Sequence, residues 1–355
     1  MRSFSSLQLP IYARTLEHFA QDGTAYFARG AWAKNFVQTV NAKGGKVSLD
    51  DFRDREALVY PAISWNRDGY ELLLANGPCE GGATNLMLAW NLFDAAGGKM
   101  AKLFSRDWLK AQLLAFVGTV IETPWVTSRA LPKDGNELAQ ASKLHADAAL
   151  KILSTAMKVP VDGSSHHSSA IVVVDAEGNI AAGMHTINTF PFGEGIFVDG
   201  VPLSSALKYE RTPPGQSVLE NVSPVIALHD GIPRFAMAQF GVGEFPTDFA
   251  VLNSVLTAGV DIVNAVMGPR IGYFDLGEDD SSKTMDHLPP IAVDPRYDRA
   301  DLCALAAEGW PLDARAKSYS SHIGYVDAVS IIPSAGPHTL RGVPAELLHG
   351  LATGY

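Results

Sequence analysis

Apolar residues recur at helical spacing through the first part of the chain. Between Leu16 and Val40 they repeat along one helix face, but Asp22-Gly23 and Arg29-Gly30 interrupt the pattern. This predicts two short helices rather than a single long one. The stretch Ala83–Phe93 is strongly apolar and predicts a helix that stops before Gly97-Gly98. The stretch Asn136–Met157 keeps the helical period without a break and predicts a helix with one face against a core.

After Pro160 the pattern changes to short β-branched runs. Ala170–Val174 is such a run, Asp175–Asn179 has the composition of a hairpin turn, and Ile180–Asn188 is the expected returning strand. Further elements are predicted at Tyr70–Ala75 (strand), Val222–His229 and Arg234–Gln239 (hairpin), Asp248–Val266 (long helix) and Tyr325–Ile332 (strand). Helices come first and hairpins later, so the order favours antiparallel sheets layered with helices over a doubly wound parallel sheet.

Composition narrows the class of protein. The chain has 355 residues, of which 47% are hydrophobic, enough for one large domain or two average ones. Its net charge of −10 argues against binding to nucleic acid. No run of apolar residues is long enough for a membrane span, and the first residues lack the apolar stretch of a secretory signal. The two cysteines, Cys79 and Cys303, offer neither a disulfide framework nor zinc spacing. We therefore expect an acidic cytoplasmic protein without a cofactor or metal.

Candidate chemistry gathers between His166 and Asn188. Ser168 and Ser169 precede a buried-looking strand, and the returning strand brings Thr186 back to the same end. A hydroxyl in this position suits nucleophilic acyl transfer but needs a base. The glycine-x-serine-x-glycine elbow of other serine hydrolases is absent from the sequence. Cleavage of the chain before the hydroxyl residue would free an α-amine that acts as the base. On this pattern alone, the serines fit a polar loop better than a catalytic site.

Several collinear stretches point to a known family. They are Gly44–Phe52, Gly77–Gly82, Ser168–Asn179 and the terminal Leu351–Tyr355. Together they resemble the γ-glutamyltranspeptidase (glutathione hydrolase) family of N-terminal-nucleophile hydrolases over nearly the whole chain. The resemblance implies an α+β fold, a four-layer α/β/β/α sandwich with two antiparallel sheets. Residues 1–167 would be the helix-rich, large-subunit-like segment and residues 168–355 the small-subunit-like segment, together one domain.

The resemblance also assigns roles around the first serine. It implies self-cleavage of the His167–Ser168 bond, which makes Ser168 the catalytic nucleophile. Thr186 and Asn188 lie eighteen and twenty residues further on, at the family's spacing for a threonine that orients the nucleophile and an asparagine that contacts substrate. Ser169 corresponds to a second hydroxyl that could help to hold the freed amine.

Later in the chain the resemblance weakens where substrate choice is set. The glycine pair of the oxyanion hole falls near Phe240-Gly241, with Gly243 close by. The paired serines that hold the α-carboxylate of a γ-glutamyl group fall at Glu220-Asn221. We expect a glutamate in that place to repel a substrate carboxylate.

The family implies an autoprocessing enzyme. A γ-glutamyltransferase or glutathione hydrolase would cleave a small-molecule amide through an acyl-enzyme on Ser168, without a cofactor. An acylase for a non-glutamyl amide is the first alternative, because of Glu220 and Asn221. A non-catalytic remnant acting as a binding subunit is the second. The resemblance starts well inside the family's large subunit, so a homo-oligomer or a missing partner chain could complete the fold.

Overall fold

The computed structural model describes residues 8–52, 58–77, 81–121, 143, 159–161, 168–186, 195–204, 224–241, 243–274, 283–285, 287–314, 323–332, 339–345 and 352–353. Residue contacts divide the chain into two units. The first unit comprises Met1–Val59 with Ile187–Lys208, and the second comprises Tyr60–Thr186 with Tyr209–Tyr355. The predicted division into residues 1–167 and 168–355 follows the expected cleavage point and stays a prediction.

The first unit is helical and aromatic. Its elements are α1 (Pro10–Asp22), α2 (Ala25–Ala28), α3 (Ala31–Ala42), the 3-10 turn η1 (Leu49–Phe52) and the short strands β6 (Phe197–Val198) and β7 (Val201–Pro202). Rings from the helices and η1 contact one another in a chain that includes Phe27, Trp32, Phe36 and Phe52. Asp199 ties the helices to the β6–β7 turn, since its carbonyl accepts from Thr15 and its carboxylate accepts from Asn35. The interruption predicted at Asp22-Gly23 is confirmed, because α1 ends there.

The second unit is built on a six-stranded sheet whose strand pairs are all antiparallel. The spatial order is β1 (Ile63–Arg67), β2 (Tyr70–Leu74), β8 (Val225–His229), β9 (Ile232–Phe240), β14 (Tyr325–Ile332) and β15 (Thr339–Val343). The strands predicted at Tyr70–Ala75, Val222–His229, Arg234–Gln239 and Tyr325–Ile332 are confirmed as β2, β8, β9 and β14. The sequence pattern did not predict β1.

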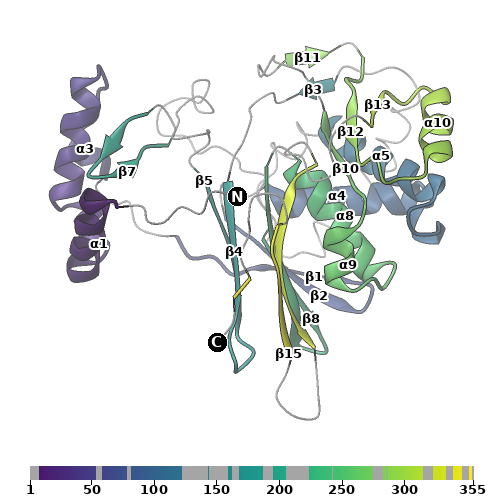
Figure 1. The fold of residues 1–355 in the computed structure, drawn as a ribbon, viewed down its shortest axis with the longest axis horizontal. Helices are drawn as coiled ribbons and strands as arrows, with labels where there is room; N and C mark the ends of the chain where they lie inside the picture. Colours follow the sequence, from purple (N-terminus) through teal and green to yellow (C-terminus); the bar gives the residue numbers. More distant parts are fainter. Residues whose placement is uncertain are drawn as a thin grey trace. The chain divides into compact units, whose positions relative to one another are not determined.

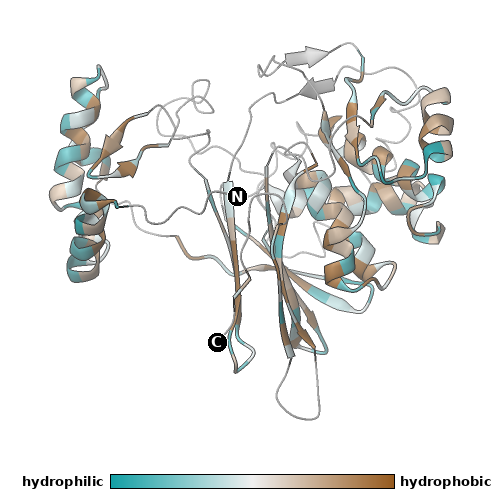
Figure 2. Cartoon of the chain, viewed as in Figure 1, coloured by the Kyte–Doolittle hydropathy of each residue, from teal (hydrophilic) through white to brown (hydrophobic). Residues whose placement is uncertain are grey.

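Helices cover one face of this sheet and a hairpin covers the other (Figure 1). The helical side carries α4 (Gly82–Ala95), α8 (Glu244–Leu256) and α9 (Ile262–Met267), and α5 (Arg106–Ile121) packs on α4. The hairpin is formed by β4 (Ser168–Val174) and β5 (Ile180–Thr186), which lie against β9 and β14. Figure 2 shows hydrophobic residues concentrated along these strands and helices. The layers observed are helices, sheet and hairpin, and the fourth, outer helical layer stays a prediction.

The core lies between the sheet and the helices. Alternate residues of the strands, such as Leu72, Val225 and Met237, face the fully buried side chains of α4 and α8. Trp90 of α4 sits at the centre, in ring contact with Trp65 and Phe249. Because successive side chains of a strand point to opposite faces, the other set of residues on β9 and β14 faces the hairpin.

Smaller sheets complete the unit. They are β10 (Ile271–Phe274) with β12 (Ile291–Val293) and β13 (Leu312–Asp313), and β3 (Val159–Val161) with β11 (Lys283–Met285). The β12–β13 pair is parallel, the exception among the described pairs. The remaining helices are α10 (Arg299–Ala307) and the 3-10 turn η2 (Gly98–Met100). No helix in the described part of the chain is long and apolar enough to span a membrane.

The long helix predicted for residues 248–266 is wrong, because two helices occupy this stretch. After α8 the backbone turns at Gly259, whose φ of +68° is favourable only for glycine. Asp261 then accepts a hydrogen bond from the backbone N–H of Val263 at 3.1 Å and so begins α9 as its N-cap. Apolar periodicity continues across the break, which is why the pattern suggested one helix. The helix predicted for residues 136–157 lies outside the described residues except for Lys143.

Candidate active site

The β4–β5 hairpin brings two predicted residues into register. Ser168 is the cross-strand partner of Thr186, and the pairing continues in step down to Val174 and Ile180 at the turn. Directly opposed residues in an antiparallel pair project from the same face of the sheet. The hydroxyls of Ser168 and Thr186 therefore share one face at the open end of the hairpin.

Burial identifies this face as the inner one. Ser168, Ala170 and Thr186 are partly buried, whereas Ser169 and His185, also a cross-strand pair, are exposed. Further along the outer face, Ile171 and Val173 of β4 are exposed as well, at 65% and 53%. Alternation along β4 thus turns Ser168 toward the six-stranded sheet and Ser169 away from it.

Packing fixes which end of the six-stranded sheet faces Ser168. Ala170 packs against a buried cluster formed by Phe240, Tyr325 and Ala345. At the other end of the hairpin, a methyl group placed on Gly178 would lie 4.0 Å from the Cδ1 atom of Ile331. β4 therefore runs along β14 in the same direction, and Ser168, two residues before Ala170, lies toward the end where β9 finishes and β14 begins.

The connection from β9 to α8 passes through glycine at this end. Gly241 has a φ of +98°, which L-residues with a side chain rarely adopt. Gly243 is the N-cap of α8, which begins at Glu244. The first backbone N–H groups of a helix lack intrahelical partners and carry a partial positive charge. The stretch from Gly241 into α8 therefore offers N–H donors of the kind that stabilise an oxyanion.

Two titratable groups on β14 face the hairpin side. Burial raises the pKa of the Tyr325 phenol, whose ring lies 5.2 Å from that of Phe240. Burial also raises the pKa of Asp327, while a hydrogen bond from the backbone N–H of Ala345, 2.7 Å from Oδ1, acts in the opposite direction. Sequence reasoning missed Asp327, although an acid inside the apolar run Tyr325–Ile332 was a visible signal.

The structure thus brings together some of the predicted site residues. Ser168 and Thr186 share the inner face, and Gly241 belongs to the end of the sheet toward which they lie. Ser169 lies on the outer face of the hairpin. The remaining candidates, His167, Asn188, Glu220 and Asn221, lie outside the described residues. The roles proposed for all of these residues stay predictions.

Comparison with known proteins supplies the family. The family model for gamma-glutamyltranspeptidase matches residues 1–335. The glutathione hydrolase proenzyme of Escherichia coli is 22% identical over 296 residues, which cover 74% of this chain and 50% of that protein. The glutathione hydrolase proenzyme of Pseudomonas aeruginosa is 23% identical over 374 residues, covering 92% of this chain and 65% of that protein. The chain therefore spans about half to two thirds of the length of these relatives.

A solved structure confirms the fold. The cephalosporin acylase from Bacillus halodurans superposes with a TM-score of 0.69 at 17% identity, covering 97% of this chain and 62% of that one. This likeness supports the mixed helix-and-sheet fold with antiparallel sheets. The family model extends over most of the sequence, including the β4–β5 hairpin and the β9–α8 connection. The chain belongs to the gamma-glutamyltranspeptidase family.

Proposed function

We propose that this protein is an autoprocessing amide hydrolase or acyltransferase with Ser168 as its N-terminal nucleophile. The observation that carries the proposal is the register of the hairpin, which pairs Ser168 with Thr186 on its inner face. A nucleophile with a neighbouring hydroxyl, near backbone donors that follow Gly241, is the minimum set for acyl transfer. Membership of the gamma-glutamyltranspeptidase family supports the same chemistry.

Maturation comes first in the proposed sequence of events. Cleavage between His167 and Ser168 adds one water across the peptide bond, leaving a carboxylate on residue 167 and a free α-amine on Ser168. That amine has a modest pKa, so it can take the hydroxyl proton at neutral pH. Nucleophile and base then belong to the same residue, which explains how a serine could act without a histidine partner.

The catalytic cycle uses the same groups. Ser168 Oγ attacks the amide carbonyl as its proton passes to the α-amine, and Thr186 orients the hydroxyl. Backbone N–H groups beside Gly241 stabilise the oxyanion. Collapse of the tetrahedral intermediate passes the proton to the leaving amine and leaves an ester on Ser168. Water or an acceptor amine then takes the acyl group and restores the hydroxyl. Asn188, Glu220 and Asn221 are the proposed contacts to the substrate.

As the first candidate substrate, we propose a γ-glutamyl compound such as glutathione, whose acyl group is γ-glutamyl. Two relatives named as glutathione hydrolase proenzymes support this choice. Glu220 favours the second candidate, an amide whose acyl group lacks the α-carboxylate, because like charges at short range repel. The substrate would be a small molecule in either case. A cytoplasmic location and assembly with a further copy or chain also stay predictions.

The mass of the purified protein tests the nucleophile. We expect the wild-type chain to yield fragments of 167 and 188 residues, Ser168→Ala to stay whole, and Ser168→Thr to mature because it keeps a hydroxyl. Turnover of γ-glutamyl-p-nitroanilide and phenylacetyl-p-nitroanilide then separates the two acyl classes. If the wild-type chain stays whole on long incubation and cleaves neither amide, a non-catalytic binding role replaces this proposal.

A further inference from the structure

The connection from β9 to α8 belongs to a closed ring of contacts. At one side of the ring, Phe240 at the end of β9 pairs with Tyr325 at the start of β14. From Phe240 the chain passes through Gly241 and Gly243 into the first turn of α8. The two residues before Tyr325, Ile323 and Gly324, contact that same turn. The connection that contains Gly241 is therefore held by contacts with Ile323 and Gly324 as well as by β9 and α8 at its two ends.

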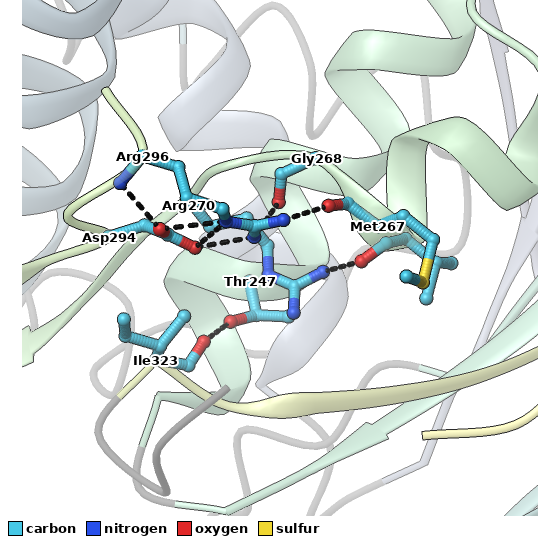
Figure 3. Close-up of polar contacts among 8 residues, drawn as sticks. Thr247, Met267, Gly268, Arg270, Asp294, Arg296 and Ile323 are labelled. Atoms are coloured by element: carbon cyan, nitrogen blue, oxygen red, sulfur yellow. Dashed lines mark hydrogen bonds and ion pairs between the residues drawn. The ribbon is translucent and has the colours of Figure 1, made fainter. Parts of the chain in front are cut away.

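Thr247 makes the first contact that closes this ring. Its Oγ1–H donates a hydrogen bond to the carbonyl of Ile323 (Figure 3). Its backbone N–H donates to the carbonyl of Gly243 at 3.1 Å. Thr247 and Ile323 are both completely buried, so water does not compete for this bond. A single residue in the first turn of α8 therefore holds both the N-cap glycine and the chain that leads into β14.

Gly324 makes the second contact, through its lack of a side chain. Its φ is +76°, and a methyl group placed on it would lie 2.6 Å from the carbonyl oxygen of Gly243 and 2.6 Å from Thr247 Oγ1. A carbon atom cannot approach backbone oxygen so closely without moving it. Glycine at this position thus lets the start of β14 pack directly on the backbone of the N-cap.

We propose that Thr247 and Gly324 are positioning residues, which hold the Gly241–Gly243 connection in the geometry needed to stabilise the oxyanion formed on Ser168. This inference rests on the function proposed above. Oxyanion donors work because they are already oriented before the charge develops. A displacement of about 1 Å of such a group costs about 100-fold in rate. Thr247 and Gly324 are both buried, so they would act through the connection that they hold.

The test removes one hydroxyl and compares it with a matched hydroxyl elsewhere. Thr247→Val deletes the bond to Ile323 at nearly constant volume, and Thr247→Ser restores it. Thr119→Val is the control, because Thr119 is 2% exposed and donates to the carbonyl of Ala115 at 2.8 Å within α5. For each variant we would measure the rate of self-cleavage, kcat and KM for the p-nitroanilide that the wild type cleaves faster, and amide hydrogen exchange of Gly241, Gly243, Glu244 and Phe245.

We expect Thr247→Val to lower kcat and the self-cleavage rate about 10- to 100-fold with little change in KM, the split typical of a lost transition-state contact. Exchange near Gly241 should rise. Thr247→Ser should recover most of the rate, and Thr119→Val should keep it. Gly324→Ala should resemble Thr247→Val if it folds. The proposal is overturned if Thr247→Val keeps the wild-type kcat, if Thr247→Ser is as slow as Thr247→Val, or if Thr119→Val loses as much rate.

The Ser168→Ala variant separates failure of this inference from failure of the proposed function. If Ser168→Ala is inactive while Thr247→Val is as fast as the wild type, the nucleophile stands and the positioning role is wrong. If Ser168→Ala cleaves as the wild type does, the proposed function is wrong, and the positioning role falls with it.

Discussion

Ser168 and Thr186 lie directly opposite each other at the open end of the β4–β5 hairpin, with their side chains on its inner face. The tight turn between Asp175 and Asn179 sets this register. Asn179 donates to the Asp175 side chain through both its backbone N–H and its amide, each at 2.8 Å. A slip by one residue would turn one hydroxyl outward, since the period of a strand is two residues.

Removing the Thr186 hydroxyl should slow the reaction on Ser168. We expect Thr186→Val to lower kcat and the self-cleavage rate about 10- to 100-fold by freeing the nucleophile to rotate, as for other misplaced groups. Thr186→Ser should keep most of the rate. Ser169→Ala is the control from the outer face and should have a smaller effect. Steady-state kinetics and mass measurements check all three. A larger loss for Ser169→Ala than for Thr186→Val would instead favour the role of Ser169 at the freed amine.

A side chain at Gly241 should impair catalysis beyond its effect on stability. Gly241→Ala forces alanine to a φ of +98°, a left-handed conformation that costs an L-residue about 1–2 kcal/mol. Gly231 has a φ of +73° in the β8–β9 turn with open space around it, so Gly231→Ala imposes similar strain far from Ser168. We expect similar losses in thermal midpoint but a fall in kcat for Gly241→Ala alone. Equal kcat values for the two variants would argue against an oxyanion role for this connection.

Arg296 should be a main determinant of stability in the second unit. Its guanidinium pairs with the completely buried Asp294, with 2.6 Å between Nη2 and Oδ2 (Figure 3). It also donates to the carbonyls of Met267 and Gly268 at the end of α9, at 2.6 and 3.1 Å. We expect Arg296→Ala to lower the free energy of unfolding by about 3 kcal/mol, because it removes the guanidinium charge that pairs with a buried carboxylate.

Chemical denaturation of that variant measures the loss. Arg296→Lys should recover little, since an ammonium group lacks the planar fork that reaches the carboxylate and two carbonyls together. Arg341→Ala is the matched control, because Arg341 pairs with Asp261 at 3.4 Å on the exposed surface. It should cost less than about 1 kcal/mol. Equal losses for Arg296→Ala and Arg341→Ala would contradict the role of burial.

Asp327 should make stability fall as pH rises. Burial raises the pKa of its carboxyl, against the opposing effect of the Ala345 hydrogen bond. A carboxyl whose pKa is raised by folding stabilises the protein fully below its unfolded pKa, and that contribution is lost as pH rises through the folded pKa. Asp327→Asn removes the charge but keeps an oxygen for the N–H of Ala345. We therefore expect a higher thermal midpoint than wild type at pH 7, with the difference shrinking toward pH 4.

Thermal midpoints between pH 4 and 8 check this prediction. Glu177→Gln provides the control, since Glu177 is exposed in the β4–β5 turn. Its midpoint should follow that of the wild type at every pH. If the wild type instead gained stability over Asp327→Asn as pH rises, the carboxylate would be stabilised in the folded state and our assignment of the dominant cause would be wrong.

Features that depend on local order along the chain could be predicted from the amino-acid sequence alone. A β-branched run and turn composition predicted the strands around Ser168 and Thr186, and the family resemblance marked these two residues as a pair by their spacing. Collinear motifs were sufficient for the family. These signals can be recognised in a single sequence because they depend only on residues that lie close together along the chain.

Tertiary packing determines which side of each strand is buried and which distant segments of the chain meet. Ser168 and Ser169 are adjacent in the sequence, but packing of Ala170 on Phe240 and Tyr325 turns Ser168 inward and Ser169 outward. The hydrogen bond from Thr247 to Ile323 joins residues that are 76 positions apart in the chain, and no sequence pattern predicts it. The sequence of a strand defines two faces, but packing against the partner sheet determines which of them is buried. This packing therefore determines where the candidate nucleophile lies.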